Sequence, residues 1–362
     1  MTLLDINVNN FRNINNICFL PDEKLTVIAG KNGQGKTNLL ESIWLLTGSK
    51  SFRGAKDIEL VQKEKTYADI KGKTCGYKKT SNINIIINGI NQDQKGRKAK
   101  VNDVDYGRAT NIAGIFTCVV FAPEHLCLVK GSPDARRRFI DAAICQLYPS
   151  YISVLHRYSR SVTQKNAQLK TGILNKSDYA VLDAIDVGLK ATGDIINAKR
   201  REYLDLLISF ATNNYQDISN NKEKLFIRYN TFFNDDDMDL ILKKSRNKDI
   251  KTGFCTAGPH RADIELFLDD EIAKTYASQG QQRSIALCMK LAEAQCGMKI
   301  TGEHPVMLLD DVLSELDIDR QSYLLTRLDN KQTIVTACDA ASFIKTNGKV
   351  YEMNDGTINL RV

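Results

Sequence analysis

Hydrophobic positions along this chain follow two different periods, and the change from one to the other divides the sequence into three parts. Residues 1–125 carry short apolar runs bounded by glycine, asparagine or proline, which predict β-strands. From 134 to about 213, apolar residues recur three and four positions apart, which predicts amphipathic helices with a break near 172–177. After residue 225 the strand pattern returns. The chain is therefore predicted to have two α/β halves that flank a helical insertion.

The predicted elements define the expected domains. Strands are expected at 3–8, 25–29, 82–88, 117–121, 225–229, 263–268, 306–309 and 333–336, with a closing hairpin at 350–360. Outside the insertion, helices are expected from Thr37, from 281 to about 296, and at 340–345. Residues 1–125 and 223–362 would form the two halves of one α/β head, and 126–222 an inserted helical arm domain. Sustained heptads are absent from the sequence, so no long coiled coil is expected.

The strand at 25–29 runs directly into a glycine-rich loop that matches the pattern G-x-x-x-x-G-K-[ST]. Such a loop surrounds phosphate oxygens with backbone amides, and the helix that follows places its positive end behind them. Lys36 would add a charge, and the Thr37 hydroxyl would bind Mg²⁺ beside the phosphates. The candidate ATP contacts are Gly30, Lys31, Asn32, Gly33, Gln34, Gly35, Lys36 and Thr37. The alternative is a glycine turn before a helix, which requires neither the lysine nor the threonine.

A second motif follows the strand at 306–309. Asp310 and Asp311 come after four apolar residues, so they lie at the carboxyl end of a buried strand. Together with the glycine loop, this arrangement favours Asp310 as a Mg²⁺ ligand, directly or through water, and Asp311 as the group that orients or deprotonates the attacking water. We therefore expect Lys36 and Asp311 to be catalytic, with ATP and Mg²⁺ as cofactors. In the alternative, the two carboxylates only cap the turn at 311–315.

The composition excludes several classes of protein. Of 362 residues, 43% are hydrophobic and 26% charged, and no apolar run approaches the ~20 residues of a membrane span. No basic segment leads into an apolar stretch at the start of the sequence, so no signal peptide is expected. The nine cysteines lack C-x-x-C spacing, which favours free buried thiols in a reducing cytoplasm over a zinc site. A net charge of +7 permits a polyanionic partner.

A third motif, at 277–283, comes just before the helix that ends near Cys296. With the two motifs above, it resembles the signature of ABC-type ATPases. That resemblance implies an ABC-type P-loop ATPase head with mixed sheets, in which Ser278, Gly280 and Gln281 contact the γ-phosphate of ATP held by the opposite subunit. Since the chain has one glycine loop and one signature, the resemblance implies an ATP-dependent, head-to-tail homodimer. The alternative is a polar helix N-cap without a ligand.

Further segments resemble, in their order along the chain, the RecF family of bacterial recombination mediators, which is related to SMC-type heads. They are NFRN at 10–13, KSFR at 50–53, FAPEHL at 121–126, KGSP at 130–133, RRRF at 136–139, GPHRAD at 258–263 and LDDVLSELD at 309–317. Within the last segment, 314–317 matches the D-loop, which crosses the dimer interface in such ATPases. The resemblance implies DNA-dependent ATP hydrolysis and binding of double-stranded DNA and gapped DNA junctions. It also implies action with RecR, RecO and RecA in recombinational repair, replication and the SOS response.

The chain departs from the broader ABC pattern at several places. Asp311 stands where a glutamate is usual, and Gln279 stands where a glycine is commoner. No histidine follows the strand at 333–336, so residues 337–339 (Ala-Cys-Asp) occupy the place of a switch histidine. Glu124 lies in the region of the usual Q-loop glutamine. These departures fit a slow, switch-like ATPase.

The basic residues become DNA candidates through the resemblance, because phosphate contacts supply most non-specific DNA affinity. The candidates are Lys50, Arg53, Arg97, Lys98 and Lys100, with Arg157 and Arg160 in the helical block. For any one of them, a solvated surface charge is the alternative. His260 is left open between a residue that faces nucleotide or DNA and a structural turn histidine, and the other histidines are expected to be structural.

Three other functions share the nucleotide motifs. The nucleotide-binding subunit of a membrane transporter would place its glycine loop and signature much closer together, without the insertion from about 66 to 260. An SMC-like structural ATPase would need hundreds of heptad residues between its halves. A small-molecule kinase would lack the signature and the D-loop. The favoured interpretation is therefore a DNA-dependent ATPase.

Overall fold

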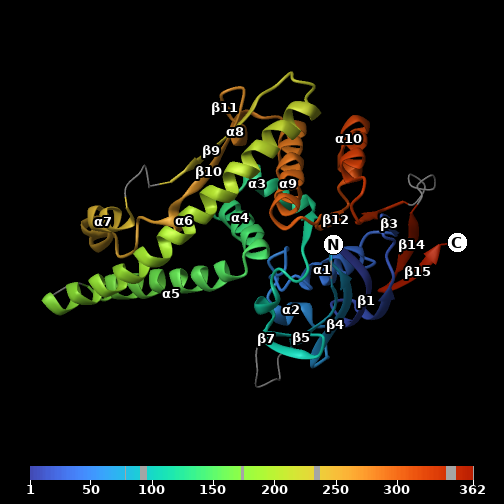
Figure 1. Ribbon diagram of the computed structural model, residues 1–362, viewed down its shortest axis with the longest axis horizontal. Coiled ribbons are helices and arrows are strands. Elements are labelled where there is room, and N and C mark those ends of the chain that lie inside the picture. Colours follow the sequence, from blue (N-terminus) through green and yellow to red (C-terminus); the bar gives the residue numbers. More distant parts are fainter. Residues whose placement is uncertain (78, 90–95, 173–174, 232–236, 340–347, 362) are drawn as a thin grey trace.

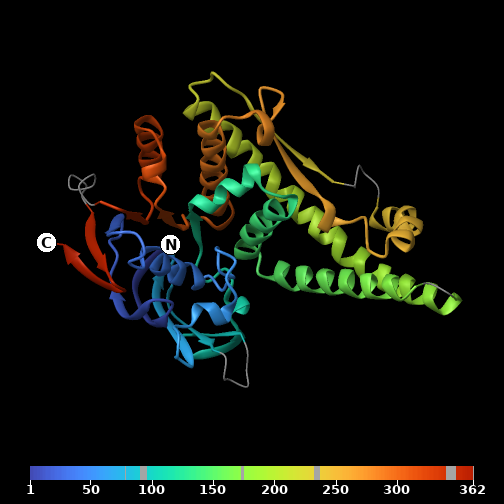
Figure 2. The same ribbon diagram turned by 180° about the vertical axis from the view of Figure 1, so that it is seen from behind.

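The structure is a computed structural model that describes residues 1–77, 79–89, 96–172, 175–231, 237–339 and 348–361. It contains a head built around two large sheets, which holds both termini, and a long helical arm that extends from one side of the head (Figures 1 and 2). The mixed α/β head and the helical insertion confirm the fold class predicted from the sequence. In the ranges given above, no helix is both long enough and apolar enough to cross a lipid bilayer.

The first sheet of the head is antiparallel and has the strand order β2-β1-β4-β5-β6-β7. Its strands are β1 (Thr2–Phe11), β2 (Ile14–Phe19), β4 (Tyr67–Cys75), β5 (Thr80–Asn88), β6 (Arg97–Val101) and β7 (Val104–Arg108). Alternate residues of β4, β5 and β6 are buried, because successive side chains of a strand point to opposite faces. One face of the sheet therefore packs into the core of the head, and the other is largely polar.

The second sheet contains the strands that carry the nucleotide motifs, in the order β15-β14-β3-β13-β12-β8. They are β3 (Leu25–Ala29), β8 (Cys118–Phe121), β12 (Val306–Asp310), β13 (Thr333–Ala337), β14 (Lys349–Asn354) and β15 (Thr357–Arg361). The strands from β14 to β8 are parallel, and β15 pairs antiparallel to β14 as the predicted closing hairpin. Helix α1 (Lys36–Leu45) follows β3 and packs into a core that both sheets share. The carboxyl ends of β3, β13 and β12 consequently meet at one edge of the sheet.

Three helices form the arm, namely α4 (Pro133–Leu147), α5 (Ser150–Thr171) and α6 (Lys176–Ile218). The interruption between α5 and α6 confirms the predicted break near 172–177. The 43-residue α6 packs along α5 and along α9 (Gln279–Thr301), and it also contacts β9 (Leu225–Asn230). One hydrophobic core therefore joins the inserted helices to elements of the last part of the chain. These helices are far shorter than the heptad arms that an SMC-like structural ATPase requires.

The remaining elements are shorter or lie beside the arm. They are α2 (Asp57–Leu60), η1 (Ala109–Ile112), η2 (Pro123–Leu126), α3 (Cys127–Lys130), α7 (Met238–Thr252), η3 (Pro259–Arg261), β10 (Asp263–Leu268), β11 (Glu271–Ile272), α8 (Ala273–Tyr276), η4 (Leu313–Glu315) and α10 (Ile318–Leu328). Strands β11, β10 and β9 form a small antiparallel sheet. Every strand that the sequence places is present, and β2, β4, β6, β7 and β11 are additional. The helix expected at 340–345 lies outside the described residues.

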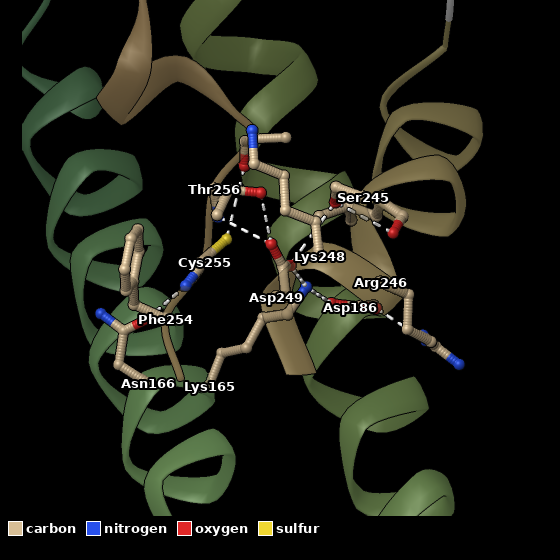
Figure 3. A network of polar contacts seen from close by, with 12 residues as sticks. Lys165, Asn166, Asp186, Ser245, Arg246, Lys248, Asp249, Phe254, Cys255 and Thr256 are labelled. Carbon is tan, nitrogen blue, oxygen red and sulfur yellow. Dashed lines mark hydrogen bonds and ion pairs between the residues drawn. The ribbon is translucent and has the colours of Figure 1, made fainter. Parts of the chain in front are cut away.

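A buried polar network fixes the outer part of the arm (Figure 3). Lys165 of α5 lies 2.9 Å from Asp186 of α6 and 2.9 Å from Asp249 of α7. Asp249 also accepts hydrogen bonds from the backbone N–H and the hydroxyl of Thr256, at 2.8 and 2.6 Å. Arg246 donates to Asp186 at 2.7 Å. The network thus connects two arm helices with α7 and with the segment that leads to η3 and β10.

The cysteines are free thiols, but they are not all buried. Burial raises the pKa of Cys145 to about 12 and that of Cys255 to about 11, so both thiols stay protonated near neutral pH. Cys18, Cys127 and Cys338 are exposed. For these three the expectation of buried thiols is wrong, because β2, the start of α3 and the end of β13 present them to solvent.

Candidate nucleotide site

The glycine loop joins β3 to α1 at the edge of the second sheet where the parallel strands end. Gly30 has a φ of 155°, and a Cβ at this position would lie 2.3 Å from the backbone oxygen of Met353 in β14. Gly35 has a φ of 111° and precedes α1 as its N-cap. A Cβ on Gly35 would lie 2.9 Å from the side chains of Asn13 and Met353. A larger residue at either position would displace the loop, so both glycines have the conformational role that the motif predicts.

Lys36 points back into the loop that precedes it. Its side chain is buried, and its ammonium group donates hydrogen bonds to the backbone oxygens of Gly30 and Lys31, the latter at 2.9 Å. Because α1 begins at Lys36, the positive end of the helix lies beside the same charge. This arrangement concentrates positive potential where the motif predicts phosphate groups.

The remaining loop residues have different surroundings. Gln34 is held by the hairpin of β14 and β15, since its side chain accepts the Asp355 N–H at 2.5 Å and its backbone oxygen accepts the Gly356 N–H at 3.0 Å. Lys31 and Asn32 are exposed. Both contacts of Gln34 therefore tie the glycine loop to the hairpin.

Asp310 ends β12 beside the start of α1. Its Oδ1 accepts hydrogen bonds from the Thr37 hydroxyl at 2.9 Å and from the Thr336 hydroxyl at 2.8 Å. Burial raises the pKa of Asp310, the two hydroxyls lower it in part, and the carboxylates of Glu124 and Asp311 raise it further. The raised pKa indicates that Asp310 is short of compensating positive charge. A hydroxyl beside a carboxylate supplies the oxygen ligands that Mg²⁺ prefers, so Thr37 and Asp310 fit the predicted ion.

Asp311 directly follows β12 and has a left-handed backbone, with a φ of 51°. Its N–H donates to Thr336 Oγ1 at 2.9 Å. The hydroxyl of Ser314, in the predicted D-loop, donates to the backbone oxygen of Asp311 at 2.8 Å and lies 3.0 Å from its Oδ1. The Cys338 thiol is 4.0 Å from the same Oδ1 and 3.2 Å from Asn32 Oδ1. Asp311 is thus held between the D-loop and the end of β13, next to the glycine loop.

These groups line one cavity of about 250 Å³ at the carboxyl edge of the sheet. Its lining residues are Asn32, Gly33, Gly35, Lys36, Thr37, Asn38, Arg53, Asp310 and Asp311. Arg53, predicted to contact DNA, therefore lies at the nucleotide cavity. Its guanidinium donates to Asn38 at 3.1 Å and is 4.0 Å from the buried carboxylate of Glu41. No spacing in the sequence indicates this position, because the segment after α1 returns to the cavity only in the fold.

The signature residues lie outside this cavity, as far as the described residues define its lining. Ser278 is the exposed N-cap of α9, and its hydroxyl accepts the Gln281 N–H at 3.2 Å. The Gln281 side chain accepts the Ser278 N–H at 2.7 Å and donates to Glu223 at 2.8 Å. Gly280 follows in the first turn, beside the guanidinium of Arg320. Within one protomer, these residues therefore form a helix cap outside the described lining of the cavity.

The basic candidates on β6 separate into two groups. Lys98 and Lys100 are exposed, as is Lys50 in the loop after α1, whereas Arg97 points to the buried face of the sheet. Arg97 forms an ion pair with Asp57 at 2.9 Å and donates to a backbone oxygen of the same loop as Lys50. Burial lowers the pKa of Arg97. The fold thus gives Arg97 a structural role in place of the predicted DNA contact.

His260 has the contacts of a structural residue. Its Nδ1 is 2.7 Å from the Tyr158 hydroxyl, and its Nε2 is 3.1 Å from the backbone oxygen of Cys255. Burial lowers its pKa to about 4, so the ring is neutral near pH 7. Arg200 holds the same turn by donating to the backbone oxygen of Pro259 at 2.7 Å. Of the two alternatives that the sequence leaves open, these contacts favour the turn histidine.

Comparison with known proteins shows which family has this arrangement. The family model of the RecF/RecN/SMC N-terminal domain matches residues 2–358. The DNA replication and repair protein RecF of Lactobacillus acidophilus is 37% identical to this chain, over 99% of the chain and 99% of its own length. The protein of the same name from Bacillus cytotoxicus is 36% identical, over 100% and 99%. The chain belongs to the RecF family.

Solved structures agree with this assignment. A structure of the recombination mediator protein RecF with ATP, from the RecFOR pathway, has a TM-score of 0.89 and 32% sequence identity, and the match covers 99% of this chain and 97% of that chain. The SMC head of Pyrococcus yayanosii has a TM-score of 0.57 at 11% identity, over 99% and 96%, and shares the fold alone. The head of this RecF-family chain is therefore that of an ABC-type ATPase, as the three motifs predict.

One residue of the RecF-family site is absent from the motifs. Thr336 contacts the Asp310 carboxylate and the backbone N–H of Asp311, yet it lies in a run of apolar residues that predicts only a strand. Its signal is positional: in the parallel register of β12 and β13, Thr336 stands directly opposite Asp310. That register requires knowledge of which strands are neighbours, which the sequence alone does not provide.

Proposed function

We propose that this chain is an ATP-dependent DNA-binding protein of recombinational repair and replication. ATP would close a head-to-tail homodimer on DNA, and hydrolysis would reopen it. The observation that supports this proposal most directly is the division of the ATP machinery between two surfaces. The glycine loop and both carboxylates line one cavity, whereas Ser278 lies on an exposed helix start elsewhere. In this proposal, a second protomer brings the two surfaces together.

Within the cavity, each group has a distinct proposed task. The backbone amides of 30–37 and the Lys36 ammonium hold the β- and γ-phosphates. Thr37 and Asp310 hold Mg²⁺, which when bound neutralises charge that develops on the phosphate oxygens. Asp311 orients or deprotonates the attacking water. Its side chain is one methylene shorter than the glutamate usual in ABC proteins, which fits slow, switch-like turnover.

The surface around Ser278 is proposed to complete the site of the other protomer. Helix α9 is 23 residues long, and its N-terminus offers backbone amides and a hydroxyl to an anion. The 3.2 Å hydrogen bond from the Gln281 N–H to the Ser278 hydroxyl occupies that hydroxyl and one of these amides within the single protomer. In the dimer, a γ-phosphate oxygen would take the place of that contact, with Gly280 leaving room for it.

The proposed partners follow from the relatives. The curated relatives are DNA replication and repair proteins, and the RecF of the solved structure is a recombination mediator of the RecFOR pathway. For this chain we propose binding to double-stranded DNA and gapped junctions in the cytoplasm, where it helps RecR and RecO to load RecA. Lys50, Lys98 and Lys100 are the proposed DNA contacts on the head. The division into 1–125, 126–222 and 223–362 is kept as the proposed domain organisation.

Mixing two inactive variants tests the composite site. Lys36→Ala removes the charge from the glycine loop, so this variant alone should not bind ATP. Ser278→Arg should bind ATP but should fail to dimerise or turn over. A mixed dimer contains one complete site, formed by the loop of the Ser278→Arg chain and the signature of the Lys36→Ala chain. Phosphate release measured with gapped DNA should therefore reappear when the two variants are combined.

The controls separate the parts of the proposal. Molecular mass from light scattering, with and without ATP, should show a dimer for the wild type and for the mixture but for neither variant alone. Recovery in the mixture supports a site shared between protomers. Full activity of Ser278→Arg by itself, or a mixture as inactive as its components, would overturn the head-to-tail arrangement.

A further inference from the structure

Thr336 occupies a central place in the sheet, at the end of β13. Strand β13 lies between β3, which leads into the glycine loop, and β12, which ends at Asp310. The parallel register puts Thr336 directly opposite Asp310, and the side chain of Thr336 is buried, with 1% of its surface exposed. The Thr336 hydroxyl is therefore enclosed, lies outside the described lining of the cavity, and contacts the Asp310 carboxylate from within the sheet.

The Thr336 hydroxyl contacts both aspartates at once. It donates to Asp310 Oδ1 at 2.8 Å and accepts the backbone N–H of Asp311 at 2.9 Å. A hydroxyl can form both bonds because it has one donor and two acceptor sites. One side chain thus fixes the carboxylate of the first aspartate relative to the backbone of the second.

The backbone of Asp311 needs such a partner. Its φ of 51° is left-handed, a conformation that is uncommon and unfavourable for residues other than glycine. In this conformation the Asp311 N–H is directed at Thr336, while Ser314 holds the backbone oxygen and Oδ1 from the other side. Loss of the Thr336 acceptor would leave the turn without one of the contacts that hold it.

Two hydroxyls donate to the same oxygen of Asp310, and they differ in what a metal ion would do to them. Thr37 lines the cavity and is itself the proposed ligand of Mg²⁺, so metal binding would redirect its oxygen. Thr336 lies behind Asp310 and can keep its hydrogen bond when the ion is present. It therefore provides the lasting constraint on Asp310.

We propose that Thr336 is a positioning residue for ATP hydrolysis, whose hydroxyl holds Asp310 in place for Mg²⁺ and Asp311 in place for the attacking water. The inference rests on the proposed Mg²⁺ site. Thr336 reaches the Asp310 carboxylate and the Asp311 backbone N–H from within the strand.

The test compares variants that differ only in the hydroxyl group. Thr336→Val replaces the hydroxyl of the wild type by a methyl group of similar size, and Thr336→Ala lacks the hydroxyl that Thr336→Ser retains. Thr333→Val is the matched control, because Thr333 lies on the same strand and is 2% exposed, and its hydroxyl donates to the backbone oxygen of Lys331 at 3.3 Å and not to either aspartate. All variants are full-length chains, and their thermal unfolding is recorded without nucleotide.

The decisive measurement is the Mg²⁺ concentration that gives half-maximal binding of a fluorescent ATP analogue at fixed nucleotide. Removing a group that orients a metal ligand typically weakens the metal site about 10-fold or more, so Thr336→Val and Thr336→Ala should raise this concentration by about that factor. Thr336→Ser and Thr333→Val should stay close to the wild type. Nucleotide binding in EDTA should be the same in all variants, and turnover should fall only where the hydroxyl is missing.

Three results would overturn the inference. If Thr336→Val or Thr336→Ala needs the same Mg²⁺ concentration as the wild type for half-maximal binding of the analogue, Thr336 does not position the site. The same conclusion holds if serine is as defective as alanine, since the hydroxyl would then be irrelevant. If the wild type itself binds the analogue without any dependence on Mg²⁺, the proposed metal site fails, and the role of Thr336 fails with it.

Discussion

Replacing Lys165 by methionine tests the polar network that holds the arm together (Figure 3). The Lys165 ammonium is 1% exposed at its side chain and is shared by two carboxylates, each at 2.9 Å. Those carboxylates are also shielded from water, with side-chain exposures of 11% for Asp186 and 1% for Asp249. Methionine keeps the length and the apolar stem of the lysine but removes the charge, so the substitution leaves two buried anions without their shared cation.

The expected cost follows from what each anion retains. Breaking a buried ion pair by removing one partner typically costs about 3–5 kcal/mol. Here Asp186 keeps its hydrogen bond from Arg246, and Asp249 keeps two hydrogen bonds from Thr256. We therefore expect Lys165→Met to lower the free energy of unfolding by about 3 kcal/mol, the lower end of this range. Lys165→Met combined with Asp249→Asn should be less destabilised than Lys165→Met alone, because one of the unpaired charges is gone.

Urea unfolding followed by circular dichroism, with hydrogen exchange to localise the effect, measures this prediction. Exchange should speed up most in α5, α6 and α7, whose contacts the network makes. The control is Lys199→Met, which breaks an exposed pair with Glu202 and should cost no more than about 1 kcal/mol. A stability of Lys165→Met equal to that of Lys199→Met, or a double variant that is the least stable of all, would refute the argument.

Two further predictions concern protonation and DNA. The pKa of His260 is lowered by burial to about 4, below the unfolded value of about 6.5, so the unfolded chain takes up the proton first. The contribution of His260 to the free energy of unfolding is therefore fully present above pH ~6.5, and it falls by about 3 kcal/mol as the pH drops to 4. In urea titrations, the free energy of unfolding of His260→Gln should not show this fall between pH 6.5 and 4. The control His156→Gln, at an exposed histidine, should show the same fall as the wild type. If His260→Gln and the wild type depend on pH in the same way, the argument for His260 is refuted. Replacing Lys98 and Lys100 by alanine should flatten the slope of log DNA affinity against log salt by about 2, since each phosphate contact contributes about 0.9. Alanine at Lys248 and Lys251 of α7 should not change the slope, and identical slopes for both pairs would remove β6 from the proposed DNA surface.

The sequence predicts the elements whose signal is local. The glycine loop, the two aspartates at the carboxyl end of β12 and the break between α5 and α6 each depend on residues close together in the chain, and all three are present. Strand β7 has every residue exposed, so it has no alternation from which it could be placed. The burial of Arg97 is different, because the alternation of β6 puts it on the same face as Ala99 and Val101. That period-2 pattern was a usable signal, which the run of basic residues obscured.

The contacts that the sequence cannot supply are those between strands distant in the chain. Asp310 and Thr336 belong to consecutive parallel strands, but their contact depends on the order in which β3, β13 and β12 assemble. Arg53 reaches the cavity because the segment after α1 folds back over Asn38. Neither feature changes the local hydrophobic pattern. Motif residues are therefore predictable from their own neighbourhood, and the residues that hold them in place are visible only in the fold.

One short segment connects the two halves of the ATP machinery within each protomer. Ser314 holds Asp311, and Arg320, six residues later, donates to Ser284 of α9 at 2.7 Å and lies beside Gly280. In the proposed dimer, Asp311 acts on one ATP while the helix of Gly280 contacts the other. A shift of this segment at one site would therefore move a contact of the second site, so the two ATP molecules should act together. The mixed dimer with a single complete site should accordingly turn over at less than half the rate of the wild type, whereas independent sites would give half.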